Sequence, residues 1–276
     1  MDDSVLSFRT LASGSSGNLA IVRSRRATLL MDLGIPTKKL LLQRLGEAGI
    51  VPGGVTAALV SHEHSDHVNW FGLQWCVAHR VPILGNRYAL RFASSLYRAK
   101  SGHDVPDGLL QEVRAGSSYL VEDVEVTPFD VPHDVPTFGY VLRSGRGGLR
   151  RKVVVATDLG CARPELLPWF TDADAVILEA NYDVEMLRRS PRHPLDKARV
   201  ASDHGHLSNV QSGRFLKEIW EASRTLPKAT LLAHLSRDHN RPELAENTVR
   251  YEAGPAGGRV PVHTAPAFEP GPEILL

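Results

Sequence analysis

Ser61-His62-Glu63-His64-Ser65-Asp66-His67 is the most informative stretch of this chain, because it places three histidines and two carboxylates in one short run. Only 12 histidines occur among the 276 residues, so this density is far above random scatter. The stretch follows a short apolar run at 56–61, which is typical of a buried strand. A tight loop after such a strand can direct imidazoles and a carboxylate toward one point. His62, His64, Asp66 and His67 can supply two ligands to each of two cations, whereas a lone tetrahedral site does not need all of them from one loop.

Three further residues of metal-binding type follow extended segments elsewhere in the chain. His133 comes just after an extended run, Asp158 follows the strand-like run 153–157, and His234 follows the apolar run 229–233. Side chains at strand ends are presented by the rigid part of a fold, which the fixed spacing of two metals requires. Nitrogen and oxygen donors without thiolates favour Zn²⁺, and Mn²⁺ and Fe²⁺ are also compatible. We therefore expect two divalent metal ions, Zn²⁺ or Mn²⁺, with Fe²⁺ as a further candidate.

The stretch 61–67 matches a His-x-His-x-Asp-His signature and so resembles the metallo-β-lactamase superfamily. The resemblance implies an α/β fold: a four-layer αβ/βα sandwich of two packed mixed β-sheets, with helices on the outer faces. It also implies the metal ligands. One metal would be held by His62, His64 and His133, and the other by Asp66, His67 and His234. Asp158 would bridge the two metals. Asp32 resembles the strand-end acid that this superfamily places beneath its metal histidines. An Asp that caps a helix is nearly as good an interpretation of Asp32.

The order of the expected elements agrees with two packed sheets. Strands come first, helices follow, strands return and helices close the chain, which suits two sheets with helices outside. The expected strands are 5–11, 18–22, 28–32, 56–61, 118–121, 124–129, 138–143, 152–157, 175–180, 230–234 and a short one near Val260. The expected helices are one between Gly34 and Gly49, then 68–78, 87–98, 208–222 and 242–251. No linker or repeat divides the sequence, so residues 1–276 are expected to form a single domain.

Composition narrows the functional classes. The chain is 42% hydrophobic and 23% charged with a formal net charge of +1, whereas a protein with a broad nucleic-acid-binding face usually carries more positive charge. Cys76 and Cys161 are its only cysteines, which excludes a disulfide framework and a Cys-rich zinc site. The acidic residues at 1–4 lack the features of a secretion signal, and no uncharged apolar run approaches membrane-spanning length. We expect a cytoplasmic enzyme that makes no membrane contact.

Segments outside the metal ligands narrow the class of substrate that we expect. The succession of 177–183, 203–209 and 232–238 resembles ribonuclease Z, in which a Gly-His-Ser segment precedes a His-x-Ser segment. The histidine of that first segment assists departure of the leaving group in ribonuclease Z, so the resemblance makes His206 a proton donor. The alternative is that His206 only supports the helix that begins near Ser208.

Four stretches, 13–18, 178–187, 205–209 and 233–240, resemble the YycJ group (also called WalJ) of the superfamily. Members of that group are regarded as DNA exonucleases, so the resemblance implies the same activity here. Leu159 departs from the Thr that the resemblance leads us to expect after Asp158, and Leu lacks the hydroxyl that Thr would offer.

We therefore expect a binuclear metal-dependent hydrolase, and within that class a phosphodiesterase or DNA exonuclease. A metal-bridging hydroxide would attack phosphorus while His206 assists the leaving group. The expected catalytic residues are Asp66, His206 and Glu179. The expected substrate-binding residues are Ser16, Asn18, Asn181, Ser208 and Arg237, and further candidate phosphate contacts are Arg188, Arg189 and Arg192. The expected partner is nucleic acid, DNA rather than RNA, and the sequence indicates no protein partner.

Two alternatives stay open. The first is a small-molecule hydrolase that acts on a cyclic phosphodiester, a thioester or a lactone, and the near-neutral charge favours it. The second is a metal-bearing interaction module without activity, against which the complete ligand set argues. The interval between Asp158 and His234 is too short for the additional domain of the β-CASP nucleases. Substrate is therefore expected to bind on the core surface near the metals.

Overall fold

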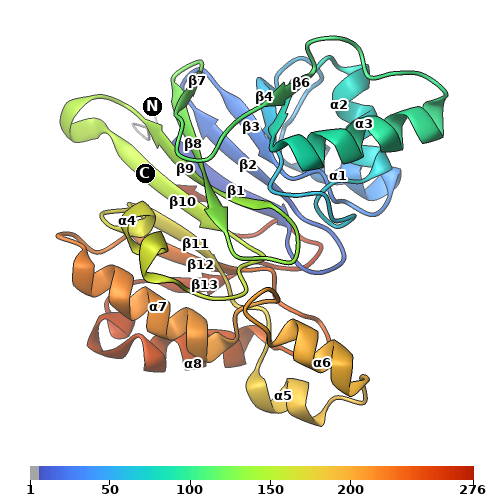
Figure 1. Cartoon of the computed structure of the whole chain (residues 1–276). Coiled ribbons are helices and arrows are strands. Elements are labelled where there is room, and N and C mark those ends of the chain that lie inside the picture. The colour runs from blue at the N-terminus through green and yellow to red at the C-terminus, as the bar shows by residue number, and fades with distance from the viewer. Residues whose placement is uncertain (1–5) are drawn as a thin grey trace.

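The first sheet is built mostly from the N-terminal part of the chain (Figure 1). A computed structural model describes residues 6–276. The seven strands of this sheet run in the order β14-β1-β2-β3-β4-β5-β6. Neighbours are antiparallel from β14 to β3 and parallel from β3 to β6, so the sheet is mixed. The bounds are β1 Leu6–Ala12, β2 Leu19–Ser24, β3 Thr28–Met31, β4 Ala57–Leu59, β5 Ile83–Gly85, β6 Leu110–Glu112 and β14 Ile274–Leu275.

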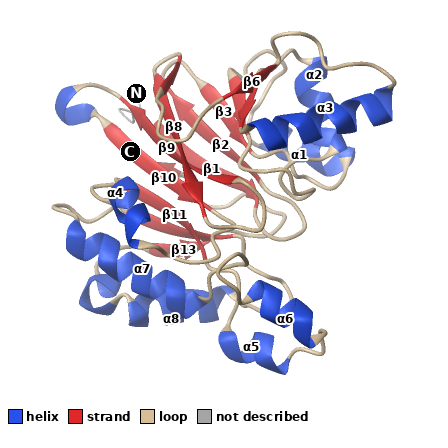
Figure 2. Cartoon of the chain, in the orientation of Figure 1, coloured by secondary structure: helices blue, strands red, loops and turns tan. Residues whose placement is uncertain are grey.

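The second sheet comes from the middle and C-terminal parts and repeats this plan (Figure 2). It also has seven strands, in the order β13-β12-β11-β10-β9-β8-β7. Pairing is antiparallel from β7 to β10 and parallel from β10 to β13. The bounds are β7 Tyr119–Val121, β8 Val124–Val131, β9 Thr137–Ser144, β10 Arg151–Ala156, β11 Ala175–Glu179, β12 Ala229–Ala233 and β13 Val262–Thr264.

Apolar side chains from the facing sides of the two sheets form the central core. Phe8 and Leu29 of the first sheet belong to the same buried cluster as Tyr140 and Ile177 of the second. The hydroxyl of Tyr140 donates a hydrogen bond of 2.7 Å to the carbonyl of Val60, which ties β9 to the segment just before the 61–67 loop. The two sheets therefore produce one shared core, because each strand presents every second side chain to it.

Helices cover the outer face of each sheet. One buried cluster packs α1, α2 and α3 on the first sheet, and another packs α4, α7 and α8 on the second. The α/β fold of two packed mixed sheets with outer helices is thus confirmed. The helix bounds are α1 Lys38–Glu47, α2 Trp70–Ala78, α3 Arg87–Ser101, α4 Leu167–Phe170, α5 Val184–Arg189, α6 Pro194–Val200, α7 Asn209–Ala222 and α8 Pro242–Glu252.

Several short elements were not predicted with bounds. The strands β5, β6 and β14 and the helices α4, α5 and α6 have at most seven residues each, which is too few for a clear periodic pattern, although β4, β7 and β13, with three residues each, were expected. The first predicted strand is present from Leu6, and its predicted start at Val5 lies outside the described residues, as does the acidic stretch 1–4.

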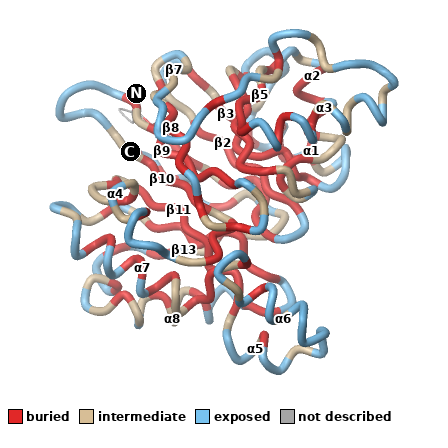
Figure 3. Tube along the Cα trace, in the orientation of Figure 1, coloured by how far each residue is buried: buried red, intermediate tan, exposed pale blue. Residues whose placement is uncertain are grey.

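The segment 183–206, which carries α5 and α6, differs from the rest of the fold. We call it the flap. It connects the end of β11 to the start of α7, and most of its residues are exposed (Figure 3). Its buried residues Leu187 and Val200 pack with Tyr182 in a small cluster separate from the three larger ones. A small apolar cluster of its own therefore holds the flap beside the sandwich.

The parallel halves of both sheets place several strand ends on one edge of the sandwich. The carboxyl ends of β3 and β4 in the first sheet lie close to those of β10, β11 and β12 in the second, and the residues that follow these strands are in contact. Within residues 6–276, none of the helices combines the length and the apolar character needed to cross a bilayer.

Candidate metal centre

Residues from both sheets converge at this edge, and they include the seven predicted metal ligands. The 61–67 loop follows β4, and His133 follows β8. Asp158 and His234 follow β10 and β12. Four strand ends that are far apart in the sequence therefore bring nitrogen and oxygen donors to one place.

The predicted first ligand group is brought together. One donor atom each from His62, His64 and His133 lies within 4.8 Å of the other two. His62 and His64 meet with their ring centroids 4.6 Å apart, and the His133 ring lies 5.2 Å from each of them. Three imidazoles at this spacing can hold one divalent cation.

The predicted second group is also brought together, and Asp158 lies between the two. Donor atoms of Asp66, His67 and His234 lie within 4.8 Å of one another, and so do those of His62, His67 and Asp158. Asp158 Oδ2 is 3.0 Å from His67 Nε2, and Asp158 Oδ1 is 3.9 Å from His133 Nε2. The carboxylate of Asp158 thus reaches toward one ligand of each group, as a bridging ligand must.

Hydrogen bonds at Nδ1 orient these histidines. His67 Nδ1 donates to Asp32 Oδ2 over 2.8 Å, and His133 Nδ1 donates to the carbonyl of Gly205 over 3.1 Å. His234 Nδ1 donates to a carboxylate oxygen of Glu179 over 2.9 Å. When these rings are neutral, each contact keeps the proton on Nδ1, so Nε2 is the atom available to a metal.

Asp32 occupies the supporting position that the sequence indicated for it. Its other oxygen, Oδ1, accepts hydrogen bonds of 2.9 Å from both the backbone N–H and the hydroxyl of Ser61. The Ser61 hydroxyl oxygen in turn lies 3.0 Å from His62 Nδ1. One buried carboxylate therefore holds the start of the loop together with His67, and it makes no helix-capping contact.

Buried polar atoms without partners test whether the residues fit metal ions. His62 Nε2, His133 Nε2 and Asp158 Oδ2 are all inaccessible to solvent and make no hydrogen bond within residues 6–276. Leaving a buried polar atom unsatisfied normally costs about 1–3 kcal/mol, so such atoms demand an explanation. All three point to the place where the ligand groups meet. The donor set therefore fits two divalent cations.

Electrostatics supports the same interpretation. Burial holds the pKa of His62 and of His133 below the usual range, so both rings are neutral and able to ligate. Burial would raise the pKa of Asp66 and Asp158, but the neighbouring imidazoles hold both well below their usual range. Ionised carboxylates at this site require positive charge: although burial lowers the pKa of His67 and His234, the nearby carboxylates raise both on balance, and divalent cations would supply this charge when bound.

Three residues of the site have a left-handed backbone. The φ angles are +59° at Asp32, +55° at Asp158 and +55° at His234. Residues other than glycine rarely adopt this region, although Asp tolerates it better than most. Each of the three follows a strand and redirects its side chain toward the centre. Backbone strain of this kind is concentrated at functional sites.

Glu179 and His206 form a pair beside the ligands. His206 Nδ1 donates to Glu179 Oε1 over 2.8 Å, and the same oxygen accepts from His234. The other oxygen, Oε2, accepts the backbone N–H groups of Leu159 and Leu207 over 3.1 and 3.0 Å. Although burial lowers it, the pKa of His206 is raised on balance because Glu179 lies so close. Leu159, where Thr was expected, is fully buried and contacts Glu179 through its backbone.

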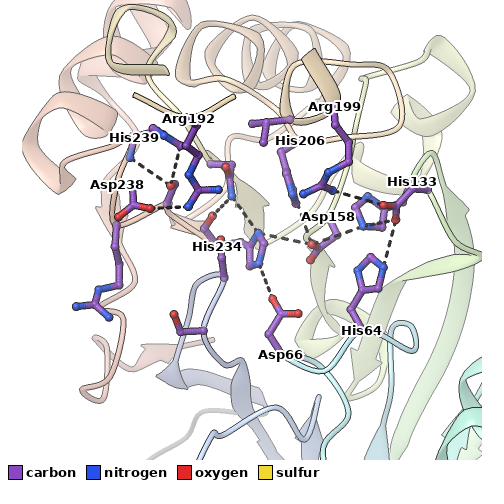
Figure 4. Close-up of a pocket in the computed structure, with 17 residues that line it drawn as sticks. His64, Asp66, His133, Asp158, Arg192, Arg199, His206, His234, Asp238 and His239 are labelled. Carbon is purple, nitrogen blue, oxygen red and sulfur yellow. Dashed lines mark hydrogen bonds and ion pairs between the residues drawn. The ribbon is translucent and has the colours of Figure 1, made fainter. Parts of the chain in front are cut away.

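A cavity of about 650 Å³ opens over the ligands (Figure 4). Ser16, Asn181, His206 and Arg237 line it, as expected of residues that bind substrate or act on it. The amide of Asn181 donates 2.8 Å to the carbonyl of His234, so it also supports a ligand.

Three other predicted residues are buried behind the cavity wall. Glu179 is fully buried behind His206 and His234. Asn18 lies 3.0 Å from His67 Nε2 and donates to the carbonyl of Gly14, and Ser208 caps α7 by accepting from the backbone of Gln211. These contacts make them supports of the site rather than groups on its surface.

Sequence reasoning missed several residues that line the cavity. Asp134 directly follows His133, and its Oδ1 lies 3.1 Å from His133 Nε2 and 3.4 Å from His64 Nε2. Arg199 lies on α6 and reaches Asp134, with 3.6 Å between Nη1 and Oδ2. Asp134 could have been found from its position next to a predicted ligand. Arg199 could not, because no bounds were predicted for α6.

Known proteins resemble this chain in sequence and in fold. Residues 33–235 match the family model described as a beta-lactamase superfamily domain. Over 253 residues the chain is 30% identical to exodeoxyribonuclease WalJ of Streptococcus pneumoniae, covering 88% of this chain and 86% of that protein. Over 256 residues it is 31% identical to exodeoxyribonuclease YycJ of Bacillus anthracis, covering 88% of each. The metallo-beta-lactamase fold protein YhfI from Bacillus subtilis superposes with a TM-score of 0.67 at 18% identity, covering 98% of this chain and 99% of that one.

Proposed function

Since this chain belongs to the beta-lactamase superfamily, as its resemblance predicted, we propose that it is a metal-dependent exonuclease that hydrolyses phosphodiester bonds of DNA. One observation carries the proposal. Two adjacent groups of metal-binding atoms lie in a cavity next to an imidazole, His206, that a buried carboxylate holds in place. Relatives named exodeoxyribonuclease support DNA as the substrate.

The proposed metal ligands are the seven residues expected from the sequence, and Zn²⁺ or Mn²⁺ is the proposed ion, with Fe²⁺ as a further candidate. Bound divalent cations lower the pKa of water and neutralise charge on a phosphate during in-line displacement. Asp66 and Asp158 supply the anionic ligands of this centre, and His67 and His234 hold them by close contacts of 3.0 to 3.6 Å.

His206 is the proposed proton donor to the departing oxygen. Its Nδ1 is bound to Glu179, which leaves Nε2 as the ring nitrogen that can act on substrate. Its side chain lines the cavity and is only 12% exposed, so little bulk water competes for the transferred proton. Glu179 touches no cavity surface and acts as a positioning residue for His206 and His234.

The test is digestion of end-labelled single- and double-stranded DNA and RNA in the presence of added Mn²⁺ or Zn²⁺. We expect products from DNA, and we expect His206→Ala to lower the rate by roughly 10²- to 10⁴-fold, the usual contribution of a general acid. Metal content, measured by elemental analysis, should stay the same as in the unaltered protein. His263→Ala, at an exposed histidine on β13, is the matched control and should retain full activity.

Two outcomes would reject the proposal. One is that metal-replete protein cleaves no DNA or RNA. The other is that a parallel panel of p-nitrophenyl phosphodiesters, thioesters and lactones is turned over well while DNA is not. The second outcome would favour a small-molecule hydrolase, which the near-neutral net charge of +1 leaves open. Single-domain organisation and a cytoplasmic location stay predictions.

A further inference from the structure

The flap carries two arginines that line the cavity, and this inference about them rests on the proposed function. Arg192 precedes α6, and Arg199 lies near its end. Both are largely exposed, with side chains 47% and 57% accessible, so both guanidinium groups can meet a ligand. In Figure 4, Arg192 lies beyond His234, and Arg199 lies between His206 and His133, above Asp158. Both arginines line the cavity that the metal-binding groups face.

Each arginine is held over the cavity by a carboxylate from outside the flap. Arg192 Nη2 lies 2.5 Å from Asp238 Oδ2, and Arg199 Nη1 lies 3.6 Å from Asp134 Oδ2. Such pairs keep a long side chain in a defined direction when no ligand is bound. A phosphate presents the same kind of oxygen fork as a carboxylate, so it can take over either guanidinium.

The other arginines of the flap have a different environment. Arg188 and Arg189 both contact Glu185 within α5, over 2.8 and 3.4 Å, and neither lines the cavity. They were candidate phosphate contacts on sequence grounds, and their position does not support that role. Arg237 does line the cavity, but its guanidinium lies 5.4 Å from the centre of the Phe268 ring. Arg192 and Arg199 are therefore the flap arginines placed to meet substrate.

Together these groups can take more than one phosphate. The metal-binding groups can hold the scissile phosphate, and two arginines then remain at different places on the cavity wall. A small phosphodiester offers no charge to those arginines, whereas a nucleic-acid strand carries a phosphate at every nucleotide. We propose that Arg192 and Arg199 each bind a backbone phosphate other than the scissile one. The flap thereby selects a polynucleotide strand over a small phosphodiester.

The first test measures equilibrium binding of a labelled single-stranded oligonucleotide to metal-loaded protein, in a His206→Ala background that slows cleavage. We expect Arg192→Gln and Arg199→Gln each to weaken binding by roughly five- to tenfold, because each removes one ionic phosphate contact. Each should also reduce the slope of log K against log salt by about 0.7, the value for one phosphate of a single strand. Arg188→Gln is the matched control and should change neither quantity.

The second test locates the contacts along the strand. Oligonucleotides with one neutral methylphosphonate at successive positions are combined with each arginine variant. If an arginine binds a given phosphate, removing both partners costs no more than removing one, and the two effects are not additive. Arg192→Gln and Arg199→Gln should each be non-additive with one position, and the two positions should differ.

The outcomes separate this inference from the proposed function. The inference would be overturned if the protein cleaves DNA but neither arginine variant changes the DNA affinity or its salt dependence. The proposed nuclease activity would then still stand. Effects that add at every methylphosphonate position would overturn it as well. Protein that binds DNA through both arginines yet never cleaves it would support the inference while rejecting the proposed activity. Unchanged folding of each variant is checked by circular dichroism.

Discussion

At the scale of single residues, the site depends on pairs of contacts rather than on isolated ligands. Each of His67, His133 and His234 donates from Nδ1 to a fixed oxygen and leaves Nε2 for the centre. Glu179 serves two such rings at once with one oxygen, and it holds two backbone segments with the other. A change at Glu179 is therefore expected to disturb His206 and His234 together.

Glu179→Gln keeps the size of the side chain and removes its charge. We expect kcat on a small phosphodiester to fall by roughly 10- to 100-fold and the affinity for the second metal to weaken, as for other partners of metal ligands. KM should change far less than kcat, because Glu179 touches no cavity surface. Steady-state kinetics and metal titration of the same preparation measure both effects. Glu221→Gln, exposed on α7, is the control, and equal metal affinity in both variants would contradict the positioning role.

The sequence was informative about residues where one short segment carries the chemistry. The 61–67 loop is recognisable in the sequence by its three closely spaced histidines, and the structure brings these residues together with His133, Asp158 and His234. It was uninformative about Arg192 and Arg199 as a pair that lines the same cavity. Their relation depends on how the flap folds back over the cavity, and no local pattern encodes that path.

At the scale of elements, the 61–67 loop rests on the segment that follows β3. Leu33 donates from its backbone to the carbonyl of His67 over 2.6 Å, and Asn18 donates to the carbonyl of Asp66 over 2.8 Å. Gly34 lies directly beneath: a Cβ atom there would come within 1.7 Å of the Asp66 carbonyl oxygen. The close approach of two backbones fixes the height of the loop and therefore the position of Asp66 and His67.

Gly34→Ala should therefore displace the loop. We expect a loss of about 1–3 kcal/mol in the free energy of unfolding, as for other overpacked sites, and loss of metal from the second ligand group. Denaturant unfolding and metal analysis measure the two effects. Gly46→Ala is a matched control, because Gly46 lies within α1 with nothing within 4 Å of the added Cβ. That variant should be stabilised by up to ~1 kcal/mol through helix propensity. Equal stability of both variants would contradict this account.

Short elements were predicted unevenly: β4, β7 and β13 have three residues each and were expected, whereas β5 and β6 were not. The longer strands and the helices α1, α2, α3, α7 and α8 were all expected, with ends shifted by a few residues. The strands β5 and β6 extend the first sheet with three residues each, too few to show a period. The helices α5 and α6 lie mostly exposed, so burial imposed little apolar pattern on their sequences.

At the scale of the whole molecule, the proposed ligands come from both sheets. His62, His64, Asp66 and His67 belong to the first half, whereas His133, Asp158 and His234 belong to the second. Bound metals would therefore connect two halves that otherwise meet through the apolar core. Binding to the folded state alone stabilises it by mass action, because the unfolded chain cannot assemble the ligands.

Removing the metals with a chelator should lower the melting temperature. A site filled at 100 times its Kd contributes about 2.7 kcal/mol, which for a chain of this size corresponds to roughly 5–10 °C. Differential scanning calorimetry before and after chelation measures the shift, and re-addition of Zn²⁺ or Mn²⁺ should restore it. His62→Ala, which deletes a buried ligand, should respond less. An unchanged melting temperature after verified removal of the metals would contradict the proposed metal centre.

The left-handed backbone at Asp32, Asp158 and His234 serves the site but lowers the stability of the metal-free protein. Each such residue other than glycine holds about 1 kcal/mol or more that a glycine would release. Laboratory evolution of metal-free protein toward heat resistance, with no screen for activity, would thus tend to replace these side chains early. The most thermostable variants would keep both sheets and lose these site residues. Retaining the site therefore depends on selection for activity, because selection for thermal stability alone acts against it.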